Sequence, residues 1–206
     1  MPPQVSNGKI SDWCSIAPRP HLMTGFFREW FKHHFADVSN IEARQLRGLL
    51  WSAMPATKIL VESITQWKPE NTEKRPAIII KRNDWSVQRV GIDDRLMGSV
   101  PLTGERYYAT YLTGTHTLFC LAGSGTQAEI LAGEVYREMI QFGPVIRHEL
   151  DLMRFAVAGV GGLFELEEAR QNYAVPVTVT YAVEERWQLT PYAPTLKKVV
   201  LSHFLP

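Results

Sequence analysis

The feature that most constrains the fold is one long amphipathic helix set between strands. The run THTLFCLA, which ends at Ala122, predicts a strand, and a helical pattern extends from Thr126 to Leu150. Its apolar side chains recur mostly at steps of three or four and therefore share one face: Ala128, Leu131, Ala132, Val135, Met139 and Phe142. Thr126 and Glu129 predict a capping box at the start of the helix, and Gly143-Pro144 kinks or ends it, after which VIRHEL adds a turn.

Two further strands follow this helix. RFAVAGVGGLFEL predicts a strand with a glycine-rich bend, and VPVTVTYAVEERWQL alternates apolar and polar residues, with Val177, Val179, Tyr181 and Val183 on one side. Such alternation indicates one solvated face and an antiparallel neighbour. The order strand, helix, strand, strand therefore predicts an α+β fold, in which a mostly antiparallel sheet is packed by one long helix.

The N-terminal part predicts an arm and two helices. We expect residues 1–25 to form an extended arm that docks through apolar residues such as Trp13, and residues 26–206 to form a single α+β domain. A helix capped by Thr24 is predicted through GFFREWFKHHFADV, and a second helix over IEARQLRGLLWSAM, stopped by Pro55. The first helix carries one aromatic face, for which core packing is favoured over docking of another subunit: Phe27, Trp30, Phe31, His34 and Phe35.

The middle of the chain predicts short strands joined by turns. KILVESITQW, RPAIIIKRN and WSVQRVGI have strand character, and the second of them predicts a buried strand over Ala77–Lys81 that ends before Asn83. Three glycines and a proline in GIDDRLMGSVPLTGE predict a long loop over Gly91–Glu105. Loops of this length often carry function.

Composition excludes several classes of protein. With 22 basic and 21 acidic residues, the net charge is +1, which gives no electrostatic footprint for nucleic acid. The two cysteines fit a reducing compartment: Cys120 is predicted to be a buried thiol, and a bridge to Cys14 is the less favoured alternative. The N-terminus does not resemble a signal peptide, and no apolar run reaches the roughly 18 residues of a membrane span, so we expect a soluble protein made in the cytoplasm.

The turn Gly123-Ser124-Gly125 matches the dinucleotide-binding pattern G-x-G-x-x-A, with Ala128 in last place. A dinucleotide site also needs an adjacent parallel strand with an acidic residue at its end. Glu149 and Asp151 have the right separation, but both precede the next strand instead of ending it. A tight strand-to-helix turn is therefore favoured, and a small-ligand or nucleotide-binding enzyme that uses this turn stays open as the alternative.

No other pattern predicts chemistry strongly. His33-His34 predicts one packed and one solvated ring, and the histidines lack the four-residue spacing of a metal-binding helix. Asp93-Asp94 is expected to be a solvated turn, and the cluster Glu165, Glu167 and Glu168 a polar hairpin end. A triad of Ser124 and His116 with an aspartate has no positive support. We therefore assign no catalytic, cofactor-binding or metal-binding residue and no cofactor.

The order of elements in residues 107–190 resembles phage tail-terminator and neck proteins. The resemblance lies in GTHTLFCLAGSGTQAEILAGEVYREMIQF followed by LMRFAVAGVGGLFELEEARQNYAVPVTVTYAVEERW. In that family one strand leads into a long helix across a sheet, and a strand-rich hairpin and an alternating strand follow. The helical N-terminal third, with its aromatic face, is similar to the helix that such proteins place before the sheet, whereas the proline-rich arm is less typical.

The resemblance implies a structural protein of the virion and not an enzyme. Family members form rings, usually sixfold, that cap the tail tube and join it to the head connector, and DNA passes through such a ring. The implied partners are other copies of the chain, the tail tube and the neck proteins, with no membrane. A ring needs heterologous interfaces, for which the interface candidates are Trp13 in the arm, Phe31 on the aromatic face, and Asp93, Asp94 and Arg95 in the long loop. A general assembly chaperone, absent from the finished particle, is a further alternative.

Overall fold

The computed structural model describes residues 20–53, 58–68, 75–88, 96–99, 105–166 and 172–189. These residues contain three helices and a seven-stranded, mostly antiparallel mixed sheet, which confirms the predicted α+β class. The helices are α1 (Pro20–Ala36), α2 (Gly125–Gln141) and α3 (Gly143–Glu149), and two 3-10 turns, η1 and η2, span Val38–Asn40 and Arg44–Leu46. The strands are β1 (Leu60–Ser63), β2 (Ala77–Gln88), β3 (Leu96–Ser99), β4 (Arg106–Ala122), β5 (Arg154–Val160), β6 (Phe164–Glu165) and β7 (Tyr173–Leu189).

The strand order in the sheet is β1-β2-β4-β7-β5, with β3 paired to β4 and β6 paired to β7. Strands β1 and β2 are parallel, with Leu60 opposite Ala77, whereas β5 and β6 run antiparallel to β7. Between β2 and β4, Asn83 donates to Thr117 and Ser86 contacts Thr113. From the first pair to the second, the residue number increases on β2 and decreases on β4, so these two strands are also antiparallel.

The described residues belong to two compact units. The larger unit comprises the described parts of Pro18–Ser86 and Thr113–Val183, and the smaller one includes those of Val87–Leu112 together with the end of β7 from Glu184. Strands β2, β4 and β7 therefore contribute residues to both units. In the smaller unit, β3 pairs with the beginning of β4, and the rings of Tyr108 and Trp187 stack with centroids 5.5 Å apart.

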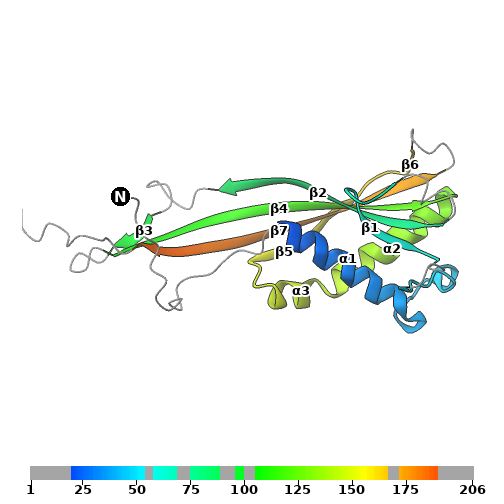
Figure 1. Ribbon diagram of the computed structural model, residues 1–206, viewed down its shortest axis with the longest axis horizontal. Helices are drawn as coiled ribbons and strands as arrows, with labels where there is room; N and C mark the ends of the chain where they lie inside the picture. Colours follow the sequence, from blue (N-terminus) through cyan, green and yellow to red (C-terminus); the bar gives the residue numbers. More distant parts are fainter. Residues whose placement is uncertain are drawn as a thin grey trace, which may run out of the picture. The chain divides into compact units, whose positions relative to one another are not determined.

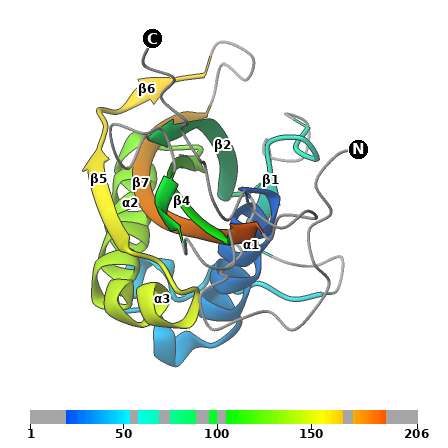
Figure 2. The same cartoon turned by 90° about the vertical axis from the view of Figure 1, so that its left-hand side faces the viewer.

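In the larger unit, all three helices lie on the same face of the sheet (Figures 1 and 2). Helix α1 lies against β1, and α2 and α3 lie against β5. The aromatic face of α1 is core, as predicted: its side chains Phe27, Phe31 and Phe35 have no exposed surface. Burial of a side chain of this size contributes about 1.5–3 kcal/mol, so these rings are a main anchor of α1 on the sheet.

Helix α1 begins at Pro20, five residues earlier than the predicted first helical residue, Gly25. Pro20, the first helical residue, has a fixed φ that suits the first turn, and its missing N–H is not needed there. Thr24 is therefore not an N-cap; its hydroxyl donates to the Pro20 carbonyl at 3.1 Å within the first turn. The expected boundary between arm and domain at residue 25 falls inside this helix, and residues 1–19 of the arm lie outside the described part of the chain.

The prediction of a second helix, over IEARQLRGLLWSAM, is wrong. Its described residues contain one 3-10 turn, η2, and the chain otherwise runs in irregular conformation. The backbone N–H groups of Glu42 and Ala43 donate to the side chain of Glu134 on α2, at 2.9 and 3.1 Å. This tertiary contact fixes the start of the segment against α2 and satisfies these two backbone groups.

Three boundaries also differ from the predictions. Helix α2 is capped by Ser124, whose hydroxyl accepts from the N–H of Gln127, and not by Thr126 with Glu129. Strand β2 does not end before Asn83 but continues to Gln88, because cross-strand contacts with β4 hold these residues in the sheet. The predicted loop Gly91–Glu105 contains β3. The break at Gly143-Pro144 and the short helix after it are as predicted.

Gly114 marks a position on β4 where the core leaves no room for a side chain. A Cβ atom there would lie 2.5 Å from the ring and hydroxyl of Tyr181 and 2.6 Å from Trp85 Nε1. These two side chains are fixed, because Trp85 donates to the Tyr181 hydroxyl at 3.2 Å and Tyr181 is buried. By contrast, a Cβ atom added at Gly133 on α2 would have no other atom within 4 Å.

We expect Gly114→Ala to lower the free energy of unfolding by about 1–3 kcal/mol, because the added methyl group overpacks the core. Gly133→Ala is the matched control and should stabilise the protein by up to about 1 kcal/mol, since alanine favours the helix. Urea unfolding followed by circular dichroism measures both changes. Equal effects of the two substitutions would contradict the packing assigned to Gly114.

Candidate functional site

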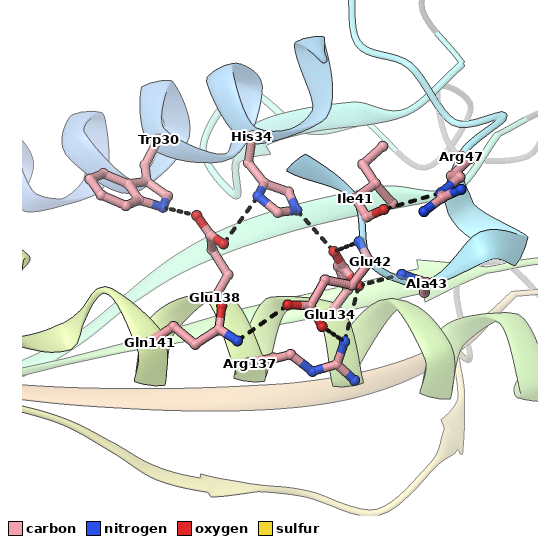
Figure 3. A network of polar contacts seen from close by, with 10 residues as sticks. All are labelled: Trp30, His34, Ile41, Glu42, Ala43, Arg47, Glu134, Arg137, Glu138 and Gln141. Carbon is pink, nitrogen blue, oxygen red and sulfur yellow. Dashed lines mark hydrogen bonds and ion pairs between the residues drawn. The ribbon is translucent and has the colours of Figure 1, made fainter. Parts of the chain in front are cut away.

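A buried polar network lies where α1 meets α2 and the segment that follows α1 (Figure 3). Its centre is the imidazole of His34 on α1, which lies between the carboxylates of Glu134 and Glu138 on α2. All three side chains are at most one-tenth exposed. Charged groups buried to this extent need partners, and the partners come from all three segments.

The helical repeat places these residues at the contact between the two helices. His34 lies three residues after Phe31 and one turn after Trp30, at the border of the buried face of α1. Glu134 and Glu138 are one turn apart on α2, each directly before a buried apolar residue, Val135 or Met139. Residues at i and i+4 project from the same side of a helix, so the two carboxylates together face the imidazole.

Both nitrogen atoms of His34 are used. Nε2 lies 3.2 Å from Glu134 Oε1, and Nδ1 lies 3.2 Å from Glu138 Oε2. The second oxygen of Glu138 accepts from the indole Nε1 of Trp30 at 2.9 Å. A ring that donates at both nitrogens is the protonated imidazolium, which matches the two carboxylates around it.

Glu134 also fixes the backbone after α1. Both of its oxygens accept backbone N–H groups, from Glu42 and Ala43, in addition to the contact with His34. At the solvent side, Arg137 pairs with Glu42 and lies 3.9 Å from Glu134, and Gln141 donates to Glu42 at 3.2 Å. The network thus joins α1, the segment after it and α2.

The pKa values follow from this geometry. Burial acts to lower the pKa of His34, but the hydrogen bonds and charges of Glu134 and Glu138 outweigh it and raise the pKa from 6.5 to about 9. Burial acts to raise the pKa of Glu134, and the donors His34, Glu42 and Ala43 reverse this, so that its pKa is lowered. At neutral pH the network therefore holds an imidazolium between two carboxylates.

This arrangement suits a structural cross-link better than acid–base or metal chemistry. A general base needs a free imidazole nitrogen and a pKa near the working pH, and His34 has neither. Within the described part of the chain, no group of three or more His, Cys, Asp or Glu side chains could hold a metal ion. The open pocket beside the network is lined by Trp30, His33, Asn40, Glu42, Gln141 and Phe142, together with His34, Ser39 and Glu138.

A second histidine, His116 on β4, is fully buried near the first turn of α1. Its Nε2 lies 2.9 Å from the Thr24 hydroxyl, and its ring packs against Phe27 and Tyr181. Burial, and then the positive charge of Arg82, lower the pKa of His116 to about 4. This histidine is therefore neutral at pH 7, and its ring packs in the core as an uncharged polar group.

The Gly123-Ser124-Gly125 turn has a structural role in this fold. Ser124 caps α2, and a Cβ on Gly125 would lie 2.7 Å from the side chain of Leu163. Strand β4, which leads into the turn, has an antiparallel neighbour in β2, whereas a dinucleotide fold needs a parallel one at this point. His116 lies on β4 six residues before its end, roughly 20 Å from the turn, so a triad with Ser124 is not formed.

The structure describes some of the residues singled out by sequence and not others. Phe31, an interface candidate, is wholly buried in the core, so its side chain is not available to another subunit. Trp13, Asp93, Asp94 and Arg95 lie outside the described residues, as do Cys14, Glu167 and Glu168. His34 is buried and His33 exposed, as predicted, and Cys120 is a buried free thiol.

Sequence reasoning missed Glu134 and Glu138. Both are charged residues on a helix whose apolar face was predicted, and neither was singled out as a buried residue. The available signal was their i, i+4 spacing beside the apolar stripe, together with a histidine at the border of another apolar face. When a residue that can be positive borders one apolar helix face and acidic residues border another, the two helices can pack against each other at these borders.

The sequence matches no protein-family model, and it matches no curated protein at a significant level. No helix among the described residues has the length and apolar character needed to cross a membrane.

We expect His34→Ala to lower the free energy of unfolding by about 3–5 kcal/mol, because it leaves two buried carboxylates without their counter-charge. His33→Ala, one residue away but exposed, is the control and should change it by less than about 0.5 kcal/mol. Urea unfolding at pH 7 measures both. A small effect of His34→Ala would show that the network does not hold α1 on α2.

The protein should lose stability in mildly alkaline solution. The pKa of His34 in the folded chain, about 9, is above its ordinary value of 6.5, so its stabilising effect is complete below pH 6.5 and disappears as the pH rises through 9. Urea midpoints measured from pH 6 to pH 10 should fall across this range. In the His34→Gln variant, the urea midpoint should no longer fall above pH 7.5. If it falls as in the original protein, the pH dependence belongs to another titrating group.

Proposed function

We propose that this chain is a structural protein of a tailed-phage virion, which forms a ring at the neck, terminates the tail tube and joins it to the head connector. The proposal starts from the resemblance of residues 107–190 to tail-terminator and neck proteins. The α+β fold supports it, since a strand leads into the long helix α2 and antiparallel strands follow.

The observation that carries the proposal is the apolar character of the two ends of the sheet. Strands β1 and β5 are the terminal strands in the sheet order. Large apolar side chains are exposed on or close to them: Ile64, Val160, Leu163 and Phe164 are 39–46% exposed. A protein that works alone usually protects its sheet edges with charges, prolines or covering segments, so edges of this kind suit contacts between subunits.

The site geometry fits a non-enzymatic role. The polar network of His34 holds helices together, and the Gly123 turn caps a helix, so neither group of residues is arranged around a substrate. We propose a homo-oligomeric ring, with six copies as the family resemblance implies, which contacts the tail tube and the neck proteins. DNA passes through this ring without sequence-specific contact, in keeping with a net charge of +1. The ring assembles in the host cytoplasm and stays in the virion.

We expect the chain to be found at the head–tail junction of a phage that carries its gene. Antibodies against the chain should label this junction in electron micrographs, and deletion of the gene should give separate heads and tails with tubes of uncontrolled length. Mass spectrometry of purified virions should detect the chain. Its absence from virions that need it for assembly would favour an assembly chaperone, and saturable stabilisation by a nucleotide would favour the ligand-binding alternative.

A further inference from the structure

The sheet of the larger unit has a second apolar cluster apart from the aromatic core under α1. Leu60, Ala77, Ile79, Leu121 and Ala174 are its buried members, and Trp67, Phe119 and Leu166 pack against them half-buried. Along β2, Ile78 and Ile80 alternate with Ala77 and Ile79, which places the cluster on the face away from the helices. The segment after β1 covers part of this face, because Trp67 belongs to it.

This cluster opens into a pocket of about 450 Å³. Its walls are aromatic and aliphatic, with Trp67, Phe119 and Phe164 joined by Ile64, Ile79 and Leu166. Phe164 on β6 packs edge-on against Phe119, with ring centroids 6.3 Å apart. The volume lies within the range of pockets that hold ligands, about 300–1,000 Å³, so apolar side chains of a partner would fit.

One of the pocket-lining side chains has a polar atom that lacks a partner among the described residues. The indole Nε1 of Trp67 is buried, and no hydrogen-bond acceptor for it exists among the described residues. A buried donor without an acceptor is unfavourable, and a backbone carbonyl of an incoming segment would relieve this. The pocket therefore suits an extended peptide with apolar side chains.

The smaller unit of the same chain has a segment of this kind. Strand β3 pairs with β4, and none of the described strands pairs with its other edge. It exposes two apolar side chains, Leu96 and Met97, which are 37% and 50% exposed. The charges also match, because Arg106 lies opposite Ser99 of β3, whereas Glu165 is exposed at the rim of the pocket.

We propose that the pocket beside Trp67 receives strand β3 of a second copy of the chain, with Met97 inserted and a β3 carbonyl accepting from Trp67 Nε1. This inference rests on the proposed ring and names the two patches that meet. Pocket and strand are different surfaces, so each copy offers one to each neighbour. Contacts of this heterologous type repeat from subunit to subunit and can close a ring.

Cross-linking between separately labelled copies tests the contact. In a Cys14→Ser background, Met97→Cys protein is mixed with Ile64→Cys protein and oxidised, and we expect a covalent heterodimer. The control mixes Met97→Cys with Val145→Cys, which is slightly more exposed than Ile64 (47% against 39%) but lies on α3, and should give none. Cys120 is buried and stays inert.

A conservative substitution tests the hydrogen bond. Trp67→Phe should weaken self-association about tenfold in sedimentation velocity without lowering the urea midpoint of the single chain, because the N–H has no partner there to lose. Trp30→Phe is the matched control. Trp30 Nε1 donates to Glu138 within the chain, so this variant should lower the urea midpoint and leave association unchanged.

Three results would overturn the inference. These are rings in which the Met97→Cys and Ile64→Cys copies do not cross-link, cross-linking that is equal in the control mixture, and a chain that stays monomeric at every concentration. The proposed function is judged separately by the presence of the chain at the head–tail junction, so it can stand if this contact fails.

Discussion

The hydrogen bonds to the carboxylate of Glu134 are the interactions on which the arrangement of the larger unit depends most. It accepts hydrogen bonds from His34 on α1 and from the backbone of Glu42 and Ala43, and it belongs to α2. Inside a protein such bonds are strong because competing water is absent, and a missing partner is correspondingly costly. One side chain thus joins the two helices and fixes the backbone at Glu42 and Ala43, shortly after α1. Glu138 and Trp30 complete the set from the other side of the imidazole.

The direction of the strands beside β4 decides how the glycine-containing turn is to be understood. A turn between a strand and a helix can bind a phosphate when parallel strands flank it and leave a crevice at their ends. Here β2 runs antiparallel to β4, and the space next to Gly125 is filled by Leu163. The same three residues that resemble a cofactor motif therefore serve to begin α2, with Ser124 as its cap.

Periodicity predicted the elements whose stability comes from one continuous face. The helix after Ala122, the alternating strand of β7 and the aromatic face of α1 were all predictable because each repeats over several turns or residue pairs. Residues 41–53 could not be predicted in the same way, since the N–H groups of Glu42 and Ala43 bond to Glu134, far along the chain. The extension of β2 through Asn83 likewise depends on Thr117. Of the polar network, only the burial of His34 was predicted, because the contact between two helix borders is a property of packing and not of either helix alone.

The two units of this protein are connected by strands that belong to both. Because β2, β4 and β7 each pass from one unit to the other, the boundary is crossed at Ser86–Val87, at Leu112–Thr113 and again at Val183–Glu184. A gene segment that encodes the smaller unit alone therefore does not exist, and recombination cannot exchange it as a cassette. New binding specificity in this unit has to arise by substitution within strands that the larger unit also needs, so the two surfaces are obliged to evolve together.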